Sequence, residues 1–316
     1  MNIVVATDSN YLKYCSAMLL SLLDKNNPSS ISVHLLSCNL SSDEIEYVHN
    51  LLTTKGAEFN VYKISDKSIN IFPNGINTHI SLATWARMYV GSLLPESVNK
   101  ILYIDCDTII TDSLNNLWNI YLDDNTLFAA VEDLNSADVS FYDNIGIRCP
   151  QNGGKPYFNA GVMLINLNLW RTKNIEQKVF DILSDKNRKL LYADQDVLNI
   201  IGAEFNITYL PLRYNLMEGL LRYDIPMMRP EATENIDIEI SSPVIVHFTY
   251  KIKPWSARSF HPYKKLFYRY FDQTQWANER PKMKLKDIVW RLAFIVAYIL
   301  NIINRYRNKT ISQLCN

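Results

Sequence analysis

Cysteine is scarce in this chain of 316 residues, and the few that occur are scattered. The five are Cys15, Cys38, Cys106, Cys149 and Cys315. Their number is odd and their spacing fits neither a metal site nor a disulfide framework, so we expect a reducing compartment. The sequence also lacks internal repeats, low-complexity segments and a basic, apolar leader, so we expect neither a repeat architecture nor a signal peptide.

Acidic residues are few at the C-terminal end of the chain. From Lys251 onward there are 14 Lys and Arg against 3 Asp and Glu, a net charge of +11. Because the whole chain is formally neutral, the first 250 residues carry −11. This asymmetry predicts a basic tail that meets an anionic surface. No other basic groove is visible, which argues against nucleic acid as the partner.

Short apolar runs alternate with amphipathic runs through the first half of the chain. The periodicity predicts strands at 2–7, 31–37 and 57–64, and helices at 12–26, 41–56 and 79–95. This βαβαβ order predicts an α/β fold with a mainly parallel sheet and helices on both faces. Such sheets bind ligands beyond the carboxyl ends of their strands, where Asp8, Asp105 and Asp107 lie.

The segment ILYIDCDTIITDSL, residues 101–114, ends an apolar run on two aspartates that point the same way. Two such carboxylates suit Mg²⁺ or Mn²⁺, which leaves coordination positions for substrate phosphates. One alternative is an aspartyl-phosphate enzyme, but its pattern places Thr or Val where this chain has Ile109. A further alternative is a simple Asp cap on the turn after the strand.

Seven segments carry a further signal when they are taken in order. They are IVVATDSNYLKYCSAMLLSLL, HISLATWARMYVGSLLP, ILYIDCDTII, YFNAGVMLINLNLWR, YADQDVLNII, LPLRYNLM and IVHFTYKIKPW. Together they resemble the family 8 glycosyltransferases, and in particular bacterial lipopolysaccharide glucosyl- and galactosyltransferases. The resemblance covers residues 1–255 and implies a catalytic domain there, a retaining enzyme with the GT-A fold that uses a UDP-hexose. Residues 256–316 are expected to form a separate helical tail.

The resemblance implies that Asp105, Asp107 and His247 bind Mn²⁺, with Mg²⁺ as the alternative. Two carboxylates and one imidazole would leave three octahedral positions for diphosphate oxygens and a water. His247 ends the apolar run PVIVHF, so a core histidine bonded to the backbone is the other interpretation.

Other residues would hold the donor nucleotide. The resemblance implies that Asp8 accepts from the uracil imide, Tyr11 stacks on the base, and Lys253 reaches the β-phosphate, with Lys251 as a weaker substitute. The family usually has Gly where this chain has Tyr250, which puts close main-chain contact with the diphosphate in doubt.

Further implied donor contacts are Ala6, Asn10, Arg87 and Cys106. The alternatives are a helix cap for Asp8 and Asn10 and a solvated helix charge for Arg87.

A last group would bind the donor sugar. The resemblance implies contacts from Asp133, Asn159, Ala160, Gly161, Asp194 and Gln195. Small residues permit close approach to a ligand, and Asp194 could instead stabilise a helix N-terminus. Of these, Asp194 and Gln195 are the catalytic candidates. Because Gln195 is an amide and a poor nucleophile, we favour same-face retention without a covalent intermediate over attack by a carboxylate such as Asp194.

The tail segment KMKLKDIVWRLAFIVAYILNIINRYRNK is mostly apolar, with basic residues at both ends. Its polar residues Asp287, Arg291, Tyr298, Asn301 and Arg305 fall on one narrow helical stripe. This pattern favours a helix lying in the plane of an anionic membrane, which predicts peripheral attachment at the cytoplasmic face. A short transmembrane anchor and a helix packed on the protein or on a second subunit are the alternatives.

We therefore expect transfer of glucose or galactose from a UDP-sugar to a hydroxyl of a glycan, a lipid-linked saccharide or a lipopolysaccharide core. Two alternatives stay open. One is a glycogenin-like primer that glycosylates its own tyrosine, since the chain has 19 tyrosines. The other is an inactive protein of the same fold that binds nucleotide sugars.

Overall fold

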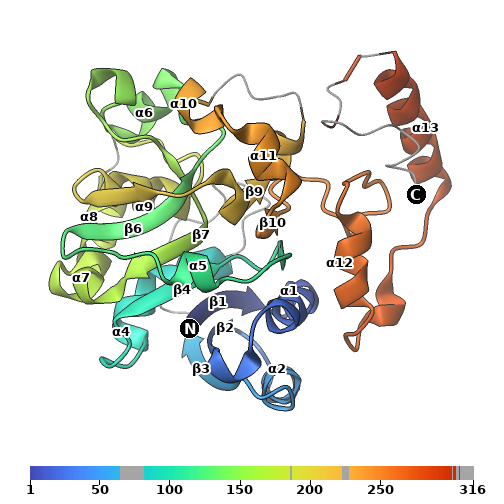
Figure 1. The fold of residues 1–316 in the computed structure, drawn as a ribbon, viewed down its shortest axis with the longest axis horizontal. Helices are drawn as coiled ribbons and strands as arrows, with labels where there is room; N and C mark the ends of the chain where they lie inside the picture. The colour runs from blue at the N-terminus through green and yellow to red at the C-terminus, as the bar shows by residue number, and fades with distance from the viewer. Residues whose placement is uncertain (65–81, 186, 223–227, 301, 304–305, 307–316) are drawn as a thin grey trace.

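The computed structural model describes residues 1–64, 82–185, 187–222, 228–300, 302–303 and 306, and its centre is a seven-stranded sheet (Figure 1). The strand order is β3-β2-β1-β4-β7-β6-β8. Four neighbouring pairs are parallel, and β7 runs antiparallel to both of its neighbours, so the expected mainly parallel sheet is confirmed. The strands are β1 (Asn2–Asp8), β2 (Ser32–Cys38), β3 (Glu58–Ile64), β4 (Lys100–Ile104), β6 (Thr126–Glu132), β7 (Phe158–Asn166) and β8 (Asn206–Tyr209).

Side chains of the central strands alternate between two hydrophobic cores, one on each face of the sheet. On β1, Ile3 and Val5 belong to one core and Val4 to the other, and on β4 Leu102 and Ile101 separate in the same way. Helices cover both cores, as expected. The first lies under α1 (Leu12–Lys25), α2 (Ser42–Thr53) and α12 (Lys264–Phe271), and the second under α7 (Leu167–Thr172), α8 (Ile175–Ser184) and α9 (Asp194–Gly202).

A small second sheet brings distant parts of the chain to the end of β4. Its strands are β5 (Thr108–Ile110), β10 (Ile245–His247) and β9 (Leu216–Met217). The antiparallel register of β10 and β5 places His247 opposite Thr108. The Phe248 amide donates to the Asp107 carbonyl at 2.9 Å. This pairing places His247 beside the two aspartates that follow β4.

The helix expected over 79–95 is wrong in part. Residues 79–81 lie outside the described residues, and the rest forms a 3₁₀ segment, η2 (Leu82–Tyr89), followed by the short helix α4 (Val90–Leu93). Within this segment Arg87 Nε donates to the Thr84 carbonyl at 3.1 Å. The remaining helices are α5 (Asn115–Trp118), α6 (Val139–Ile145), α10 (Pro230–Thr233), α11 (Ile236–Ser241) and α13 (Leu285–Ile299).

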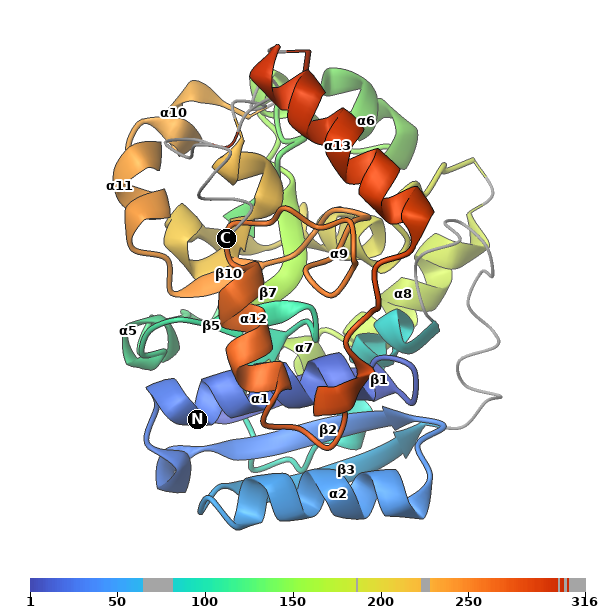
Figure 2. The ribbon, with the colours of Figure 1, turned by 90° about the vertical axis from the view of Figure 1, so that its right-hand side faces the viewer.

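The C-terminal part packs on the body formed by the two sheets before α13 reaches the edge of the molecule (Figure 1). Figure 2 shows α12 beside α1, where Tyr270 donates to Asp24 at 2.8 Å and Phe271 stacks 6.4 Å from Tyr14. In the described part of the chain, no helix has both the length and the apolar character needed to cross a membrane. The domain boundary at residue 255 stays a prediction.

The polar stripe of α13 faces the protein. Asp287 accepts from Arg258 at 2.8 Å, Arg291 donates to the Ser259 carbonyl at 3.1 Å, and Tyr298 is buried. Asn301 and Arg305, which the sequence places on the same stripe, lie outside the described residues. The outward face is therefore apolar, and its exposed side chains are Leu285, Ile288, Val289, Leu292, Val296, Ile299 and Leu300.

Candidate active site

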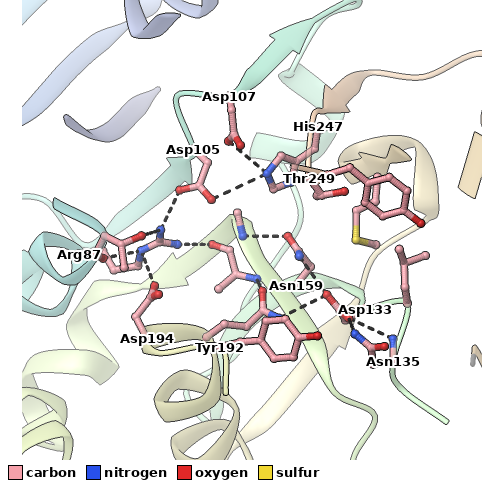
Figure 3. A pocket seen from close by; sticks show the side chains of 17 residues that line it. Arg87, Asp105, Asp107, Asp133, Asn135, Asn159, Tyr192, Asp194, His247 and Thr249 are labelled. Carbon is pink, nitrogen blue, oxygen red and sulfur yellow. Dashed lines mark hydrogen bonds and ion pairs between the residues drawn. The ribbon is translucent and has the colours of Figure 1, made fainter. Parts of the chain in front are cut away.

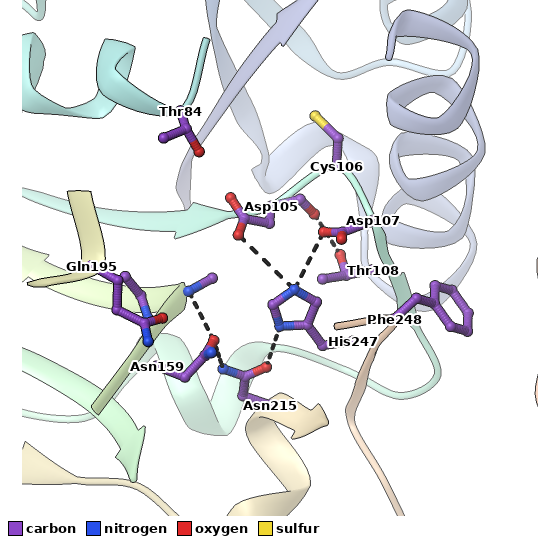
Figure 4. Close-up of polar contacts among 12 residues, drawn as sticks. Thr84, Asp105, Cys106, Asp107, Thr108, Asn159, Gln195, Asn215, His247 and Phe248 are labelled. Atoms are coloured by element: carbon purple, nitrogen blue, oxygen red, sulfur yellow. Dashed lines mark hydrogen bonds and ion pairs between the residues drawn. The ribbon is translucent and has the colours of Figure 1, made fainter. Parts of the chain in front are cut away.

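Asp105, Asp107 and His247 form one cluster at the carboxyl end of β4 (Figure 4). One ligand atom from each residue lies within 4.8 Å of the other two. His247 Nε2 is 3.3 Å from Asp107 Oδ1 and 3.9 Å from Asp105 Oδ2. Two carboxylates and an imidazole are a donor set suited to a divalent cation such as Mn²⁺ or Mg²⁺, so these residues fit the expected metal.

Asn215 fixes the orientation of the histidine ring. Its Nδ2 donates to Asn159 Oδ1 at 2.8 Å, which turns its Oδ1 toward His247 Nδ1, 2.9 Å away. An amide oxygen can only accept, so Nδ1 carries the proton and Nε2 is directed at the aspartates. Asn215 is fully buried. It is thus an outer partner of the cluster that the sequence interpretation missed.

Gly161 on β7 makes room for the cluster. A Cβ at this position would lie 2.2 Å from His247 Cε1 and 2.8 Å from Asp105 Oδ2. Its carbonyl accepts from the Asp105 amide at 2.8 Å. A small residue was expected here for approach to a ligand; in the structure it permits the approach of the imidazole and the carboxylate.

The two aspartates have different cationic neighbours. Lys253 Nζ donates to Asp107 Oδ2 at 2.8 Å and also to the Phe248 carbonyl. Burial opposes the ionisation of Asp107, but Lys253 and His247 outweigh it and hold its pKa below the usual range. Burial raises the pKa of Asp105 despite a nearby guanidinium, and the charge of Asp107 adds to the rise. The pair therefore retains negative charge that its protein neighbours neutralise only in part.

Arg87 lies between the aspartates and the start of α9 (Figure 3). Its guanidinium donates to Asp105 Oδ1 at 2.8 Å and to the Ala160 carbonyl at 2.6 Å, and it lies 2.9 Å from Asp194 Oδ2. Only 3% of Arg87 is exposed. Burial disfavours its charge, yet the carboxylates outweigh this and raise its pKa. Burial also raises the pKa of Asp194 to about 7. Arg87 thus forms part of the wall and holds Asp194 in place.

A network of amides and carboxylates occupies the far side of the cluster. Asp133 Oδ2 accepts from Asn159 Nδ2 at 3.0 Å and from Gln195 Nε2 at 3.3 Å. Gln195 Oε1 accepts from the Ala160 amide at 3.0 Å. Both ends of the Gln195 amide are therefore held. Asp133, Asn159 and Gln195 all line the same cavity.

Two cavities share Asp105 and Asp107 as their border. The first cavity, about 360 Å³, and the second cavity, about 670 Å³, both include Asp105 and Asp107. The expected residues on the first cavity are Arg87, Asp105, Asp107, Asp133, Asn159, Ala160, Gly161, Asp194, Gln195 and His247. Those on the second cavity are Ala6, Asp8, Tyr11, Asp105, Cys106, Asp107 and Lys253. Asn10 is exposed and is not among the lining residues of either.

Four described residues that line both cavities were missed or left undecided by the sequence interpretation. They are Thr84, Tyr192, Thr249 and Tyr250. Thr249 follows His247 by two residues, so the alternation that paired Asp105 with Asp107 could have pointed to it. The hydroxyl of Tyr250 lies 3.0 Å from where Gly219 would carry a Cβ. Its bulky side chain therefore packs toward Gly219.

The described fold and site are those of a glycosyltransferase with the GT-A fold, and comparison with known proteins supports this class. The chain belongs to the glycosyl transferase family 8, whose sequence profile matches residues 2–259. A Haemophilus influenzae protein named as a glycosyltransferase is 31% identical over 217 residues, which cover 68% of this chain and 63% of that relative.

Two other relatives carry more specific names. The lipopolysaccharide 1,2-glucosyltransferase of Escherichia coli is 25% identical over 90% of this chain and 82% of its own length. The crystal structure of the galactosyltransferase LgtC, in complex with donor and acceptor sugar analogs, superposes with a TM-score of 0.75 at 26% identity. That match covers 88% of this chain and 100% of LgtC.

Proposed function

We propose that this enzyme transfers a hexose from a UDP-sugar to a hydroxyl of a saccharide acceptor and that it requires a divalent cation, Mn²⁺ or Mg²⁺. The observation that carries the proposal is the place of Asp105 and Asp107 on the border of both cavities. A nucleotide in the second cavity and a sugar in the first would put the linking diphosphate at the aspartate pair. When bound there, the cation would supply positive charge to the diphosphate of the leaving group.

The second cavity offers groups suited to the nucleotide. Asp8 can accept from a base N–H, and the rings of Tyr11 and Trp255 lie 6.3 Å apart in an edge-to-face arrangement. Lys253 is close enough to Asp107 to reach a phosphate oxygen held at the cluster. Lys253 would stabilise UDP as it departs.

The first cavity offers groups suited to the hexose. Asp133 and Asn159 provide carboxylate and amide groups for sugar hydroxyls, and Gln195 is held at both ends of its amide. Asp194 is held by Arg87, so we do not assign it the part of a nucleophile. We propose same-face substitution: the acceptor oxygen bonds to C1 as the bond from C1 to the phosphate oxygen breaks, and the acceptor proton passes to the departing phosphate.

The acceptor is proposed as a glycan, a lipid-linked saccharide or a lipopolysaccharide core, in keeping with the name of the Escherichia coli relative. Peripheral attachment to the cytoplasmic face of the membrane is also proposed. Its support is the outward apolar face of α13, where Leu292 is 58% and Val296 54% exposed, next to the exposed Lys282, Lys284 and Lys286. Apolar area together with basic charge suits an anionic lipid surface.

A donor screen tests the reaction. The full chain is incubated with UDP-glucose or UDP-galactose, with Mn²⁺ or with EDTA, and UDP release is followed with and without deacylated lipopolysaccharide core oligosaccharides or lactose. We expect one UDP-hexose to be hydrolysed slowly alone, faster with an acceptor, and not at all with EDTA. Activity that persists in EDTA would contradict the proposed need for a divalent cation. No turnover of either UDP-hexose would contradict the proposal that the donor is a UDP-hexose.

A flotation assay tests the membrane surface. Leu292→Ser and Val296→Ser together should reduce binding to vesicles of phosphatidylglycerol and phosphatidylethanolamine by about tenfold, because they remove exposed apolar area. The matched control is Ile238→Ser on α11, where the side chain is 61% exposed but far along the chain from the tail. Equal binding by the double variant and the control would contradict the proposed surface.

A further inference from the structure

Tyr250 lies against a wall built by the segment after β9. Its hydroxyl points toward the position that a Cβ on Gly219 would take, and the Arg222 guanidinium lies 5.5 Å from its ring centroid. Gly219 has no side chain, and an added Cβ would lie 2.4 Å from Leu134 Cδ1 and 3.0 Å from the Tyr250 hydroxyl. Leu134 and Met217 line the first cavity but are not among the lining residues of the second. Leu134 and Met217 therefore place this wall on the first cavity, and Tyr250 stands where the wall meets the second.

Glu218, Arg222 and Tyr306 form a group behind this wall, which we call the C-terminal clamp. Glu218 and Tyr306 are buried, and Arg222 is partly exposed. The Tyr306 hydroxyl donates to Glu218 Oε1 at 2.7 Å and accepts from Arg222 Nη2 at 2.9 Å. Arg222 also donates to Glu218 Oε1 at 2.7 Å. The Arg222 guanidinium lies 4.5 Å from the Tyr306 ring centroid, so aromatic rings of Tyr306 and Tyr250 both contact it.

The clamp is continuous with the tail. The Tyr306 amide donates to the Tyr298 hydroxyl at 3.2 Å, and Tyr298 belongs to the inward stripe of α13. Arg222 and Tyr306 also form an antiparallel β-bridge. Tyr306 is 3% exposed although it lies near the end of the chain. Tyr306, a residue of the tail, thus holds the side chain of Arg222, whose guanidinium lies against the ring of Tyr250.

We propose that Tyr306 is a positioning residue for the acceptor saccharide, acting through Arg222 on Tyr250. The polar side chains of the first cavity suit the hydroxyls of the donor hexose, whereas Leu134, Met217 and the ring of Tyr250 offer an apolar wall. A sugar ring has polar edges and an apolar face, so the second sugar would place that face on this wall. The inference rests on the proposed hexosyl transfer and adds the surface that receives the acceptor.

The test compares transfer with donor hydrolysis in the full chain, using the UDP-hexose and the oligosaccharide or lactose acceptor that the wild type uses. Tyr306→Phe removes the hydroxyl of the clamp and should raise the acceptor KM about fivefold. Gly219→Ala should also raise it, because the new Cβ displaces Tyr250 or Leu134. The matched control is Tyr270→Phe, which removes a hydroxyl bonded at 2.8 Å to Asp24, on α12. The donor KM should change no more in Tyr306→Phe than in this control.

A double-mutant cycle separates positioning from stability. In a Tyr250→Ala background, Tyr306→Phe should no longer change the acceptor KM, because the residue through which it acts is gone. An equal change in both backgrounds, or an acceptor KM in Tyr306→Phe no higher than in Tyr270→Phe, would overturn the inference. A wild type that neither hydrolyses nor transfers any UDP-hexose would instead defeat the proposed function, so the two failures are distinguishable.

Discussion

Two regions of the molecule bury charged side chains, and they balance the charges differently. The described residues lining the two cavities include five aspartates, against three Lys and Arg side chains: Asp8, Asp105, Asp107, Asp133 and Asp194, and Arg87, Lys251 and Lys253. In the C-terminal clamp, Glu218 pairs with one arginine and Tyr306 adds a neutral donor. The cavities therefore have an excess of negative charge, whereas the clamp is balanced.

The pKa shifts follow this difference. Burial raises the pKa of Asp105, and raises that of Asp194 to about 7, so both carboxylates lack sufficient positive charge nearby. Burial opposes the charge of Arg222, yet Tyr306 and Glu218 outweigh it and raise its pKa. An unbalanced group of carboxylates in a cavity gains from an added cation, whereas a balanced pair gains nothing. The excess of negative charge is therefore a property of the two cavities, where a cation would be stabilised. The C-terminal clamp, whose charges are balanced, instead supports the wall beside Tyr250.

The largest expected effect comes from removing charge on the cavity side. Asp107→Asn should lower kcat/KM for the UDP-hexose by about 10³-fold, because the cluster loses a cation ligand and Lys253 loses its partner. Saturating Mn²⁺ at about 100 times its Kd should stabilise the wild type by about 2.7 kcal/mol and this variant far less, as a thermal-shift titration would show. Asp112→Asn, an exposed aspartate after β5, is the control. An unchanged Mn²⁺ response in Asp107→Asn would mean that the cation binds elsewhere.

Breaking the clamp should affect stability rather than metal binding. Arg222→Met should lower the free energy of unfolding by about 3 kcal/mol, because Glu218 is left buried without its cation. The side chain of Glu218 is 4% exposed. Lys178→Met breaks the pair with Glu204, whose side chains are 35% and 53% exposed, and should cost about 0.5 kcal/mol or less. Urea unfolding measures the free energy of unfolding of both variants. Equal losses would contradict the distinction between the buried pair and the exposed pair.

The sequence predicts the clear periodic elements because their signals are local. Strand β1 and helix α1 follow from apolar spacing. The two aspartates were expected on one side of an extended strand, but β4 ends at Ile104 and both lie in the turn before β5, so their common direction comes from that turn and not from strand alternation. The sequence predicted a regular helix where η2 is a 3₁₀ segment, and it did not show that Arg87 of this segment pairs with Asp105 and Asp194, which come later in the chain. No local pattern marks Asn215 as the partner of His247, since the contact joins residues 32 positions apart.

The C-terminal tail shows the same limit of prediction from sequence. The spacing of Asp287, Arg291 and Tyr298 predicts a polar stripe but not the direction in which it faces. Arg258 and the carbonyl groups of Ala257 and Ser259 turn it inward, and these partners lie about 30 residues earlier in the chain. The direction of an amphipathic helix therefore depends on tertiary contacts that its own sequence does not contain.

The neighbourhood of the clamp should also respond to pH. Burial lowers the pKa of His261 to about 4; the charge of Glu218 opposes this shift, and the charges of Arg222 and Lys253 add to it. The unfolded chain has the higher histidine pKa and binds the proton first, so stability is retained above about pH 6.5 and lost as the pH falls toward 4. We expect wild type to lose about 2 kcal/mol more than His261→Asn between pH 7 and pH 5 in urea unfolding. Parallel pH profiles would contradict a neutral buried His261.

The smallest expected effect tests the outer partner of the metal cluster. Asn215→Ala leaves all three ligands in place but removes the amide oxygen that fixes His247 Nδ1, 2.9 Å away. Loss of such an outer partner should weaken Mn²⁺ binding about tenfold. Calorimetric titration of the full chain with Mn²⁺ measures this change in affinity. Mn²⁺ affinity that is equal in Asn215→Ala and wild type would show that the histidine needs no such partner, and the buried amides would then act on the sugar side alone.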